Sequence, residues 1–390
     1  MNLDCTAQIH LKAKKDESIR RFHPWIFSGA IKSIEGDPKS GDLVEVYSNK
    51  GGFMGTGHYT DGSIAVRILS FSEPLTRENL IAKFKSAMDY RMDLGLYREN
   101  YNTIFRLIHA EGDWLSGLIV DFYHDTFVIQ SHSQGWNRLV PMVAEILQEI
   151  WPNKLASIYS KPKEKDVESK YLLQNGDAQK WGYENGYKLA VDWETGQKTG
   201  FFIDQRVNRQ LLGEFAKDKT ILNTFCYSGG FTISSLAAGA KEVHSLDSSA
   251  GALDLVTQNL QLNGFDSAKH QNIQADAVDY VRDLPTDYDI IVLDPPAFAK
   301  HMSARHKAVQ GYKRLNGHAI RQIKPGGLIF TFSCSQVVDN NLFNHTITSA
   351  ALAVGRKVRI VQQLHQPADH PINIYHPESE YLKGLVLQVE

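Results

Sequence analysis

Between residues 220 and 333 the chain alternates short, almost continuously apolar segments with helical ones, and this pattern restricts the fold more than any other feature. Strands that are apolar along their whole length are buried on both faces, which is typical of a parallel sheet covered by helices on both sides. We therefore expect an α/β domain with a mostly parallel sheet. Its strands are predicted at residues 220–225, 242–247, 288–293 and 328–333.

The C-terminal end of the chain holds two further apolar segments, residues 357–361 and 384–389. They follow each other as a terminal pair of strands. A final strand inserted antiparallel into an otherwise parallel sheet fits this arrangement, since such mixed sheets are common.

The first half of the chain has a different texture. Residues 1–72 alternate apolar and polar positions in short runs that glycine-rich turns interrupt, which predicts a small β-rich domain. Thr76 is placed to cap a helix, and residues 103–190 resume strands around a second helix, as in a compact α+β unit. The apolar stripe of the first helix is a packing surface, formed by Leu80, Phe84, Ala87, Met88 and Met92.

The 390 residues exceed one ordinary domain, and we predict three parts: residues 1–73, residues 74–188 and residues 189–390. A hydrophobic fraction of 42% with 22% charged residues is typical of a soluble globular protein. No apolar run is long enough for a membrane span or a secretory signal, so we expect a cytoplasmic protein without a membrane partner.

The cysteine positions and the net charge also bear on which kinds of site the chain can hold. The three cysteines are far apart and form no pair or Cys/His cluster at metal-ligand spacing, so neither a disulfide framework nor a metal site is expected. The net charge of −2 neither favours nor excludes nucleic acid, which leaves local basic patches to decide.

Polar residues suited to a nucleotide-like ligand stand at the ends of successive predicted strands. A Gly229-Gly230 turn follows the first strand, where open α/β sheets bind ligands, although such a turn alone is weak evidence. Asp247 ends the second strand, where its carboxylate can accept both ribose hydroxyls. Asp276-Ala277 is placed to bind an adenine amine. Asp294-Pro295-Pro296 follows the strand predicted at residues 288–293 and is the fourth such group of residues at a strand end. The spacing does not fit GxGxxG, which disfavours NAD, and no phosphate-binding P-loop motif exists.

Several longer motifs resemble one known family. KTGFFIDQR at residues 198–206, NTFCYSGGF at residues 223–231 and DPPAF at residues 294–298 resemble the class I large-subunit rRNA methyltransferases that make 5-methylcytosine. The segment RFHPWIF at residues 21–27 resembles the opening of their PUA RNA-binding domain. RLIHAEGD at residues 106–113 resembles their middle domain. The resemblance thus covers nearly the whole chain.

The resemblance implies a fold and a cofactor. It implies a Rossmann-like methyltransferase domain with a mostly parallel seven-stranded sheet, preceded by a PUA-like β-barrel and a middle α+β domain. It also implies S-adenosylmethionine as cofactor, with Arg206 as candidate for the methionine carboxylate. Ser228 stands where the family more often has Thr, and Asn223 where methyltransferases of this class have an acidic residue. The implied cofactor residues are Arg206, Phe225, Tyr227, Ser228, Gly229, Asp247, Asp276, Ala277 and Asp294.

Methylation of cytosine at carbon 5 needs a nucleophile, because that carbon is a poor nucleophile until a thiolate has added to carbon 6. Cys334 follows the strand next to the one that ends at Asp294, and we predict it as the attacking group. Asp294 is predicted to bind the cytosine amino edge and orient the ring. Cys226 is interpreted as packing and Cys5 as inert. The group that accepts the carbon-5 proton is unassigned.

Two other functions stay open. Asp-Pro-Pro-aromatic loops also occur in enzymes that methylate base nitrogens without a nucleophile, where Phe298 would stack on an extruded base. A non-catalytic RNA-binding or ribosome assembly factor is the second alternative.

The resemblance implies large-subunit (23S) rRNA as partner and a homodimer as the assembly state. The candidate RNA-binding residues are Arg20, Arg21, His23, Phe298 and Lys300.

Overall fold

The computed structural model describes residues 3–164, 166–285 and 287–390, which form two compact units. Unit 1 comprises the chain up to Gly182 together with Val191–Phe201 and Ala368–Ser379. Unit 2 comprises Tyr183–Ala190, Phe202–Pro367 and Glu380–Glu390. The chain therefore passes more than once from one unit to the other.

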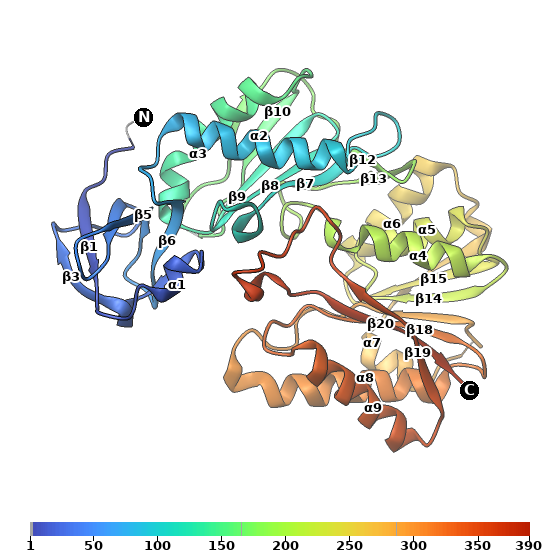
Figure 1. Cartoon of the computed structure of the whole chain (residues 1–390). Coiled ribbons are helices and arrows are strands. Elements are labelled where there is room, and N and C mark those ends of the chain that lie inside the picture. The colour runs from blue at the N-terminus through green and yellow to red at the C-terminus, as the bar shows by residue number, and fades with distance from the viewer. Residues whose placement is uncertain (1–2, 165, 286) are drawn as a thin grey trace. The chain divides into compact units, whose positions relative to one another are not determined.

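A six-stranded sheet in the order β2-β6-β5-β4-β1-β3 opens unit 1 (Figure 1). Its apolar core includes Ile9, Val44 and Val66, none of which is exposed to solvent. This confirms the β-rich start predicted from alternation. The elements are β1 (Ala7–Leu11), α1 (Glu17–Arg20), β2 (Trp25–Phe27), β3 (Ile31–Glu35), β4 (Leu43–Tyr47), β5 (Phe53–Tyr59) and β6 (Ile64–Phe71).

The helix predicted after Thr76 is α2 (Arg77–Asp93). The Thr76 side chain accepts from the backbone N–H of Asn79, whose side chain accepts in return from the N–H of Thr76, so a capping box fixes the helix start. The predicted apolar stripe is buried except for Met92, which is half-buried. Arg91, which no pattern singled out, is also fully buried and pairs with Asp113 at 2.5 Å.

The rest of unit 1 is built around a five-stranded sheet in the order β11-β10-β9-β8-β7. Helix α3 buries Trp136 and most of its apolar face in one large core, to which α2 also contributes. This confirms an α+β middle region. The elements are β7 (Ile104–His109), β8 (Leu118–Tyr123), β9 (Thr126–Ser131), α3 (Gln134–Ile150), β10 (Ser157–Ser160) and β11 (Lys170–Gln174). The paired strands β12 (Trp181–Glu184) and β13 (Tyr187–Ala190) follow in the chain, and β13 already belongs to unit 2.

Unit 2 contains a seven-stranded sheet in the order β16-β15-β14-β17-β18-β20-β19. Its first five strands pair in parallel, and β20 pairs antiparallel with both β18 and β19, as the terminal pair predicted. The strands are β14 (Thr220–Thr224), β15 (Glu242–Asp247), β16 (His270–Gln274), β17 (Ile290–Leu293), β18 (Leu328–Ser333), β19 (Val358–His365) and β20 (Lys383–Val389).

Helices cover both faces of this sheet. Figure 1 shows α4, α5 and α6 on one side and α7, α8 and α9 on the other. One core contains Leu212 of α4 with Val292, and the opposite core contains Leu315 of α8 with Ile291, so neighbouring positions of β17 face opposite sides. The helices are α4 (Arg206–Ala216), α5 (Gly230–Ala237), α6 (Ala250–Asn263), α7 (Ala277–Arg282), α8 (Arg305–Gln322) and α9 (Asn340–Val354).

The strand order reverses at β14, because β15 lies on one side of it and β17 on the other. Open α/β sheets bind ligands at the carboxyl ends of the strands beside such a reversal. Short 3₁₀ turns complete the fold at Ser28–Ala30, Ala110–Asp113, Ile203–Gln205, Ser267–Lys269, Met302–Ala304 and Pro377–Ser379.

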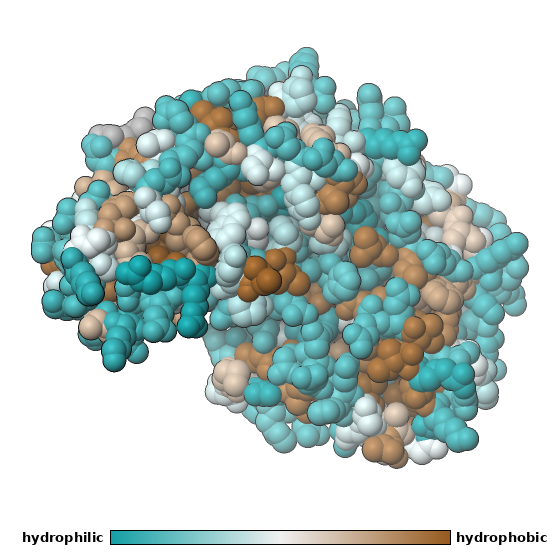
Figure 2. Space-filling model, viewed as in Figure 1, coloured by the Kyte–Doolittle hydropathy of each residue, from teal (hydrophilic) through white to brown (hydrophobic). Residues whose placement is uncertain are grey.

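The surface of unit 2 has one apolar area at the edge of its sheet. Figure 2 shows apolar residues gathered over β19. Ile360 and Val361 of this edge strand are 50% and 46% exposed. Within the described residues, no helix combines the length and the apolar character needed to cross a membrane.

Candidate functional site

The loop after β14 has an unusual backbone. Phe225 and Tyr227 have left-handed φ values of 53° and 46°, which cost free energy in residues with a side chain, and Gly229 has φ 75°. The backbone N–H of Cys226 donates to the carbonyl of Leu246 at 3.1 Å, and that of Gly229 donates to Cys226 at 2.8 Å. These bonds hold the strained loop at the carboxyl edge of the sheet, where the cofactor is expected.

Asp247 connects this loop to the next strand. One carboxylate oxygen accepts from the backbone N–H of Tyr227 at 3.1 Å, and the other from that of Ser249 at 3.0 Å. A carboxylate has about four acceptor positions, so two remain for other donors. The half-buried side chain of Asp247 therefore suits the pair of ribose hydroxyls predicted for it.

The glycines of this turn have a reason that the sequence did not reveal. A Cβ at Gly229 would lie 3.0 Å from the side chain of Val256, and a Cβ at Gly230 would lie 2.8 Å from Arg209. The absent side chains allow α5 to pack closely against α6 and α4. Close approach of a ligand is therefore not needed to explain either glycine. Ser228 is buried, and its carbonyl accepts from Asn259 at 2.7 Å.

Asp276 caps a helix. One of its carboxylate oxygens accepts from the backbone N–H groups of Val278 and Asp279 at 2.9 and 3.0 Å, which satisfies the start of α7. Asp276 is exposed and Ala277 is buried, directly beyond the end of β16. The capping bonds explain Asp276 structurally, and its predicted contact with adenine stays a prediction.

Two buried arginines lie on α4. Arg206 is its first residue and has 4% of its surface exposed. Arg209, which sequence reasoning missed, forms two hydrogen bonds of 2.6 Å with the buried carboxylate of Glu184. The contact of Arg206 with the methionine carboxylate stays a prediction.

Asp294 and Cys334 directly follow β17 and β18, which pair in parallel with Leu293 opposite Thr331. Both side chains are half-buried, and that of Cys334 packs at the border of the core that contains Phe332. The adjacency of the two strands confirms the expected neighbourhood. Both residues thus lie at the sheet edge that also carries Asp247.

Ser335 ties the two loops together, and sequence reasoning missed it. Its buried hydroxyl donates to the carbonyl of Ala299 at 3.1 Å. The same hydroxyl accepts from the N–H of Ala299 and from the hydroxyl of Tyr312, both at 3.3 Å. The single donor and both acceptor positions are used, so the Asp-Pro-Pro loop and the segment of Cys334 have a fixed relation.

Lys383 is a second residue that no pattern indicated. It lies on β20 opposite Ser333 and has 4% of its surface exposed. Its ammonium donates to the carbonyls of Ser335 and Tyr381, each at 2.8 Å. Burial lowers the pKa of Lys383 to about 8. A cation therefore lies beside the chain segment that contains Cys334.

The other two cysteines are poorly suited to nucleophilic attack. Burial raises the pKa of Cys5 to about 11. Burial raises the pKa of Cys226 further, and the charge of Asp247 acts in the same direction. The thiolate is the reactive form of cysteine, so both stay protonated and unreactive at neutral pH. The interpretation of Cys226 as a buried packing residue is confirmed.

The candidate RNA-binding residues lie at separate places. Phe298 packs its ring on Tyr312 of α8 at 4.6 Å between centroids, and Lys300 beyond it is exposed. Arg20 and Arg21 are exposed at the end of α1, where they pair with Asp16 and Glu17. Arg20 also lines a groove of the β domain with Ile19, Phe22, Ser48, Gly52, Phe53, Met54, Phe71 and Ser72.

A second groove lies between α8 and α9 in unit 2. It is basic, because Lys313, Arg314 and Arg321 line it together with neutral residues. These three cations of α8 therefore border a concave surface. Such a surface suits the phosphates of a nucleic acid.

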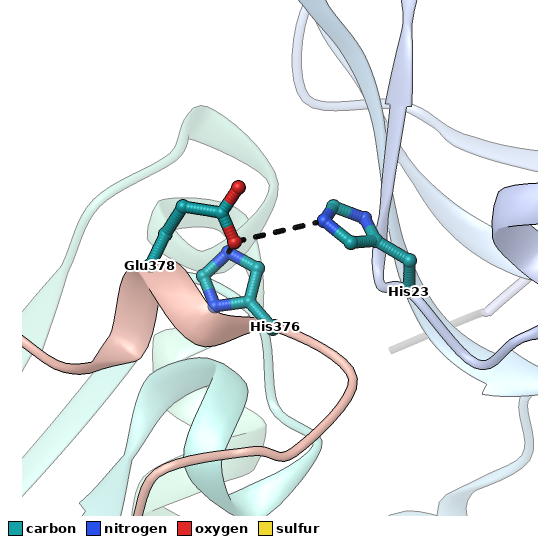
Figure 3. Close-up of side chains that lie close together, drawn as sticks. All are labelled: His23, His376 and Glu378. Atoms are coloured by element: carbon teal, nitrogen blue, oxygen red, sulfur yellow. Dashed lines mark ion pairs between the residues drawn. The ribbon is translucent and has the colours of Figure 1, made fainter.

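One cluster in unit 1 brings potential metal-ligand atoms within 4.8 Å of one another: His23, His376 and Glu378 (Figure 3). Glu378 lies 3.8 Å from Nε2 of His23 and 3.7 Å from Nε2 of His376. The backbone N–H of Trp25 donates to Nδ1 of His23 at 3.1 Å, while Nε2 of the same ring faces Glu378. We therefore interpret the cluster as a structural contact that attaches the segment Ala368–Ser379 to the region of the six-stranded sheet. The RNA contact predicted for His23 stays a prediction.

Comparisons with known proteins agree with this architecture. A sequence profile described as a PUA-like domain matches residues 9–71, and one described as an S-adenosylmethionine-dependent methyltransferase matches residues 162–381. The chain is 37% identical over 399 residues to ribosomal RNA large subunit methyltransferase I of Pseudoalteromonas translucida, which covers 98% of this chain and 100% of that protein. The protein of the same name from Aeromonas hydrophila is also 37% identical and covers 98% and 99% of the two chains.

Two solved structures share the fold. A putative SAM-dependent methyltransferase from Streptococcus mutans superposes with a TM-score of 0.84 at 23% identity, over 98% of this chain and 99% of that one. A putative methyltransferase complexed with SAH gives a TM-score of 0.84 at 22% identity, with the same coverage of 98% and 99%. The whole chain therefore has the architecture of these proteins.

Proposed function

Because the chain belongs to the ribosomal RNA large subunit methyltransferase I family, we propose that it methylates carbon 5 of a cytosine in large-subunit (23S) rRNA. The protein is an S-adenosylmethionine-dependent enzyme. The observation that carries the assignment to carbon 5 is the position of Cys334. This cysteine and Asp294 end paired parallel strands at the sheet edge that also carries the loop of Tyr227 and Asp247.

The residues at this edge fit the cofactor. S-adenosylmethionine supplies the methyl group from a sulfonium centre. Arg206 binds the methionine carboxylate through its guanidinium, and the two free acceptor positions of Asp247 bind the ribose hydroxyls. The strained loop presents its backbone to the ligand through Phe225, Tyr227, Ser228 and Gly229, while Asp276 and Ala277 contact the adenine.

The chemistry assigns one role to each of two side chains. The Cys334 thiolate forms a bond to carbon 6, and the electrons of the 5,6 double bond make carbon 5 nucleophilic toward the methyl group. Loss of the carbon-5 proton then restores the double bond and expels the thiolate. Asp294 accepts a hydrogen bond from the cytosine amino group and keeps the ring oriented during these steps.

The substrate and the assembly state follow from the same family. The rRNA binds along exposed cations that include Arg20, Arg21 and Lys300, with His23 and Phe298 as further contacts. An rRNA substrate places the enzyme in the cytoplasm. A homodimer would cover the apolar edge strand β19, and sedimentation of the chain with Val361→Lys tests this assembly.

The deciding experiment compares Cys334→Ala with the wild type in cells that lack the gene. We expect that cells with Cys334→Ala contain no 5-methylcytosine at the target position in 23S rRNA, whereas cells with the wild type do. Mass spectrometry of digested rRNA measures this. Binding of S-adenosylmethionine by isothermal titration should stay near the wild-type affinity, since the cysteine contacts the base and not the cofactor.

The two alternatives give different results. Full methylation by Cys334→Ala would exclude the covalent route and favour a base nitrogen as the methyl acceptor. A wild-type chain that does not bind S-adenosylmethionine would instead support a non-catalytic assembly factor.

A further inference from the structure

Lys383 lies beside both neighbours of Cys334 in the chain. On β20 it pairs with Ser333, the residue before the cysteine, and its ammonium donates to the carbonyl of Ser335, the residue after it. The second bond, to the carbonyl of Tyr381, keeps the side chain on this side of the strand. The ammonium is thereby fixed next to one particular peptide segment.

The surroundings of this cation are unusual. Lys383 is buried, and within the described part of the chain its ammonium donates to two neutral carbonyls and forms no ion pair with a carboxylate. The loss of water around a buried ammonium is unfavourable unless a negative charge nearby compensates it. Packing of the strand alone does not explain a lysine here, since an apolar side chain at the same position would avoid the free energy of dehydrating the charge.

We propose that the ammonium group of Lys383 stabilises the thiolate of Cys334 and so prepares it to attack the cytosine ring. The proposal deepens the function above and rests on Cys334 as its nucleophile. Lys383 is then a positioning residue that acts through the cysteine. In this step the thiol proton leaves to solvent, the sulfur keeps the electron pair that forms the bond to carbon 6, and the ammonium retains its protons.

The charges around the pair support this direction. Burial lowers the pKa of Lys383, whereas a negative charge on Cys334 raises it, and Glu380 and Asp339 act in the same raising direction. An interaction that favours the ammonium when the thiolate is present equally favours the thiolate when the ammonium is present. At neutral pH the lysine is mostly charged, because its pKa is about 8.

Other titratable groups face the site from neighbouring elements. Burial raises the pKa of Tyr312 on α8, and the charge of Cys334 is a further cause, so this phenol stays neutral. Its hydroxyl bonds Ser335 and not a charged group. Asp294, at the end of β17, adds negative charge at the same edge and acts against the thiolate. Lys383 is thus the cation that opposes it.

Alkylation of Cys334 tests the proposal without any methyl transfer. The rate of modification by iodoacetamide is followed from low to high pH on the full chain, with the peptide of Cys334 quantified by mass spectrometry. Cys5 and Cys226 serve as slow internal references. The variants are Lys383→Met, Lys383→Arg, which keeps the charge, and Lys357→Met, an exposed control.

We expect the wild-type midpoint to lie below the value of about 8.5 for an ordinary cysteine. Lys383→Met should slow alkylation at neutral pH about tenfold and raise the midpoint, while Lys383→Arg and Lys357→Met stay close to the wild type. Equal profiles for Lys383→Met and the wild type would overturn the proposal. Should Lys383→Met fail to fold, a wild-type midpoint at or above about 8.5 overturns it.

The two proposals fail separately. If Cys334→Ala keeps full methylation, the proposed reaction is wrong, although the alkylation profile still reports whether Lys383 lowers the proton affinity of the thiol. If the profile is insensitive to Lys383 but Cys334→Ala is inactive, the reaction stands and the role of the lysine is wrong.

Discussion

The carboxylate of Asp247 holds the backbone N–H of Tyr227 at 3.1 Å, so one side chain both ends β15 and fixes the strained loop after β14. Asp247 is also proposed to bind the ribose hydroxyls of the cofactor, so its substitution would affect binding in two ways. Its removal loses the loop contact and the acceptor positions together.

Asp247→Asn should therefore weaken S-adenosylmethionine binding. The loss of hydrogen bonds to a charged acceptor is worth about 1.5–3 kcal/mol, which corresponds to roughly 10- to 100-fold in the dissociation constant measured by isothermal titration. Asp254→Asn on the exposed face of α6 is the matched control and should bind normally. An unchanged affinity in Asp247→Asn would remove this residue from the cofactor site.

Gly229→Ala should destabilise unit 2. The new Cβ would be held at φ 75° and would lie 3.0 Å from Val256, for a combined cost of about 1–3 kcal/mol in urea unfolding. Gly264→Ala has a similar φ of 64° with open space around the Cβ, so it isolates the backbone contribution of about 1 kcal/mol. The double change Gly229→Ala with Val256→Ala should relieve the contact, and equal costs for the two glycines would contradict the packing explanation.

Unit 1 should lose stability in mild acid because of His58. Burial lowers the pKa of His58 to about 3, and neither ring nitrogen has a hydrogen-bond partner among the described residues. The His58 ring takes up a proton near pH 6.5 in the unfolded chain but only near pH 3 in the folded chain. The stability that the neutral His58 ring contributes is therefore fully present above pH 6.5 and decreases as the pH falls from 6.5 toward 3.

The loss at pH 5 amounts to about 2 kcal/mol for this one ring. Urea midpoints at pH 7 and pH 5 measure it, and His58→Phe should reduce the difference because phenylalanine does not titrate. His132 of the same unit, whose pKa burial lowers to about 4, acts in the same direction and leaves a residual slope. A difference between the two midpoints that is identical in His58→Phe and the wild type would show that His58 is not neutral in the folded chain.

The groove between α8 and α9 should contribute to RNA affinity. Arg314→Glu with Arg321→Glu reverses two of its cations, and we expect weaker rRNA binding together with a shallower dependence on salt. Each lost phosphate contact lowers the slope of the logarithmic salt plot by about 0.7–0.9. Lys241→Glu is the control in the same filter-binding or anisotropy titration. Lys241 is exposed and lies at the start of β15, at the end of the strand away from Asp247. Equal salt slopes for all three proteins would place the RNA elsewhere.

The sheet of unit 2 was predictable because its strands carry their own signal. The segments that became β14, β15, β17 and β18 are apolar on both faces, and each prediction differs from the observed bounds by two residues at most. The carboxyl-end positions of Asp247, Asp294 and Cys334 followed directly, since parallel strands place their ends at one edge.

The supporting polar residues were not predictable, because each acts on a partner far away in the chain. Lys383 bonds Ser335 across 48 positions, and Arg209 pairs with Glu184 across 25. A buried Arg or Lys has no periodic pattern of its own and looks in the sequence like any exposed charge. The packing role of the Gly229-Gly230 turn could not be predicted either, because Val256 and Arg209, which a Cβ at these positions would meet, lie on other helices.

The passage of Ala368–Ser379 through unit 1, between β19 and β20, restricts the order in which the protein is completed. Arg91 and Arg106 bond Asp369 in this segment, so unit 1 must already exist to receive it. Strand β20, which carries Lys383, lies between β18 and β19, two strands that precede it in the chain. A chain cut at any point between β19 and β20 would keep Cys334 and every residue proposed to bind the cofactor, yet it would lack the strand that carries Lys383.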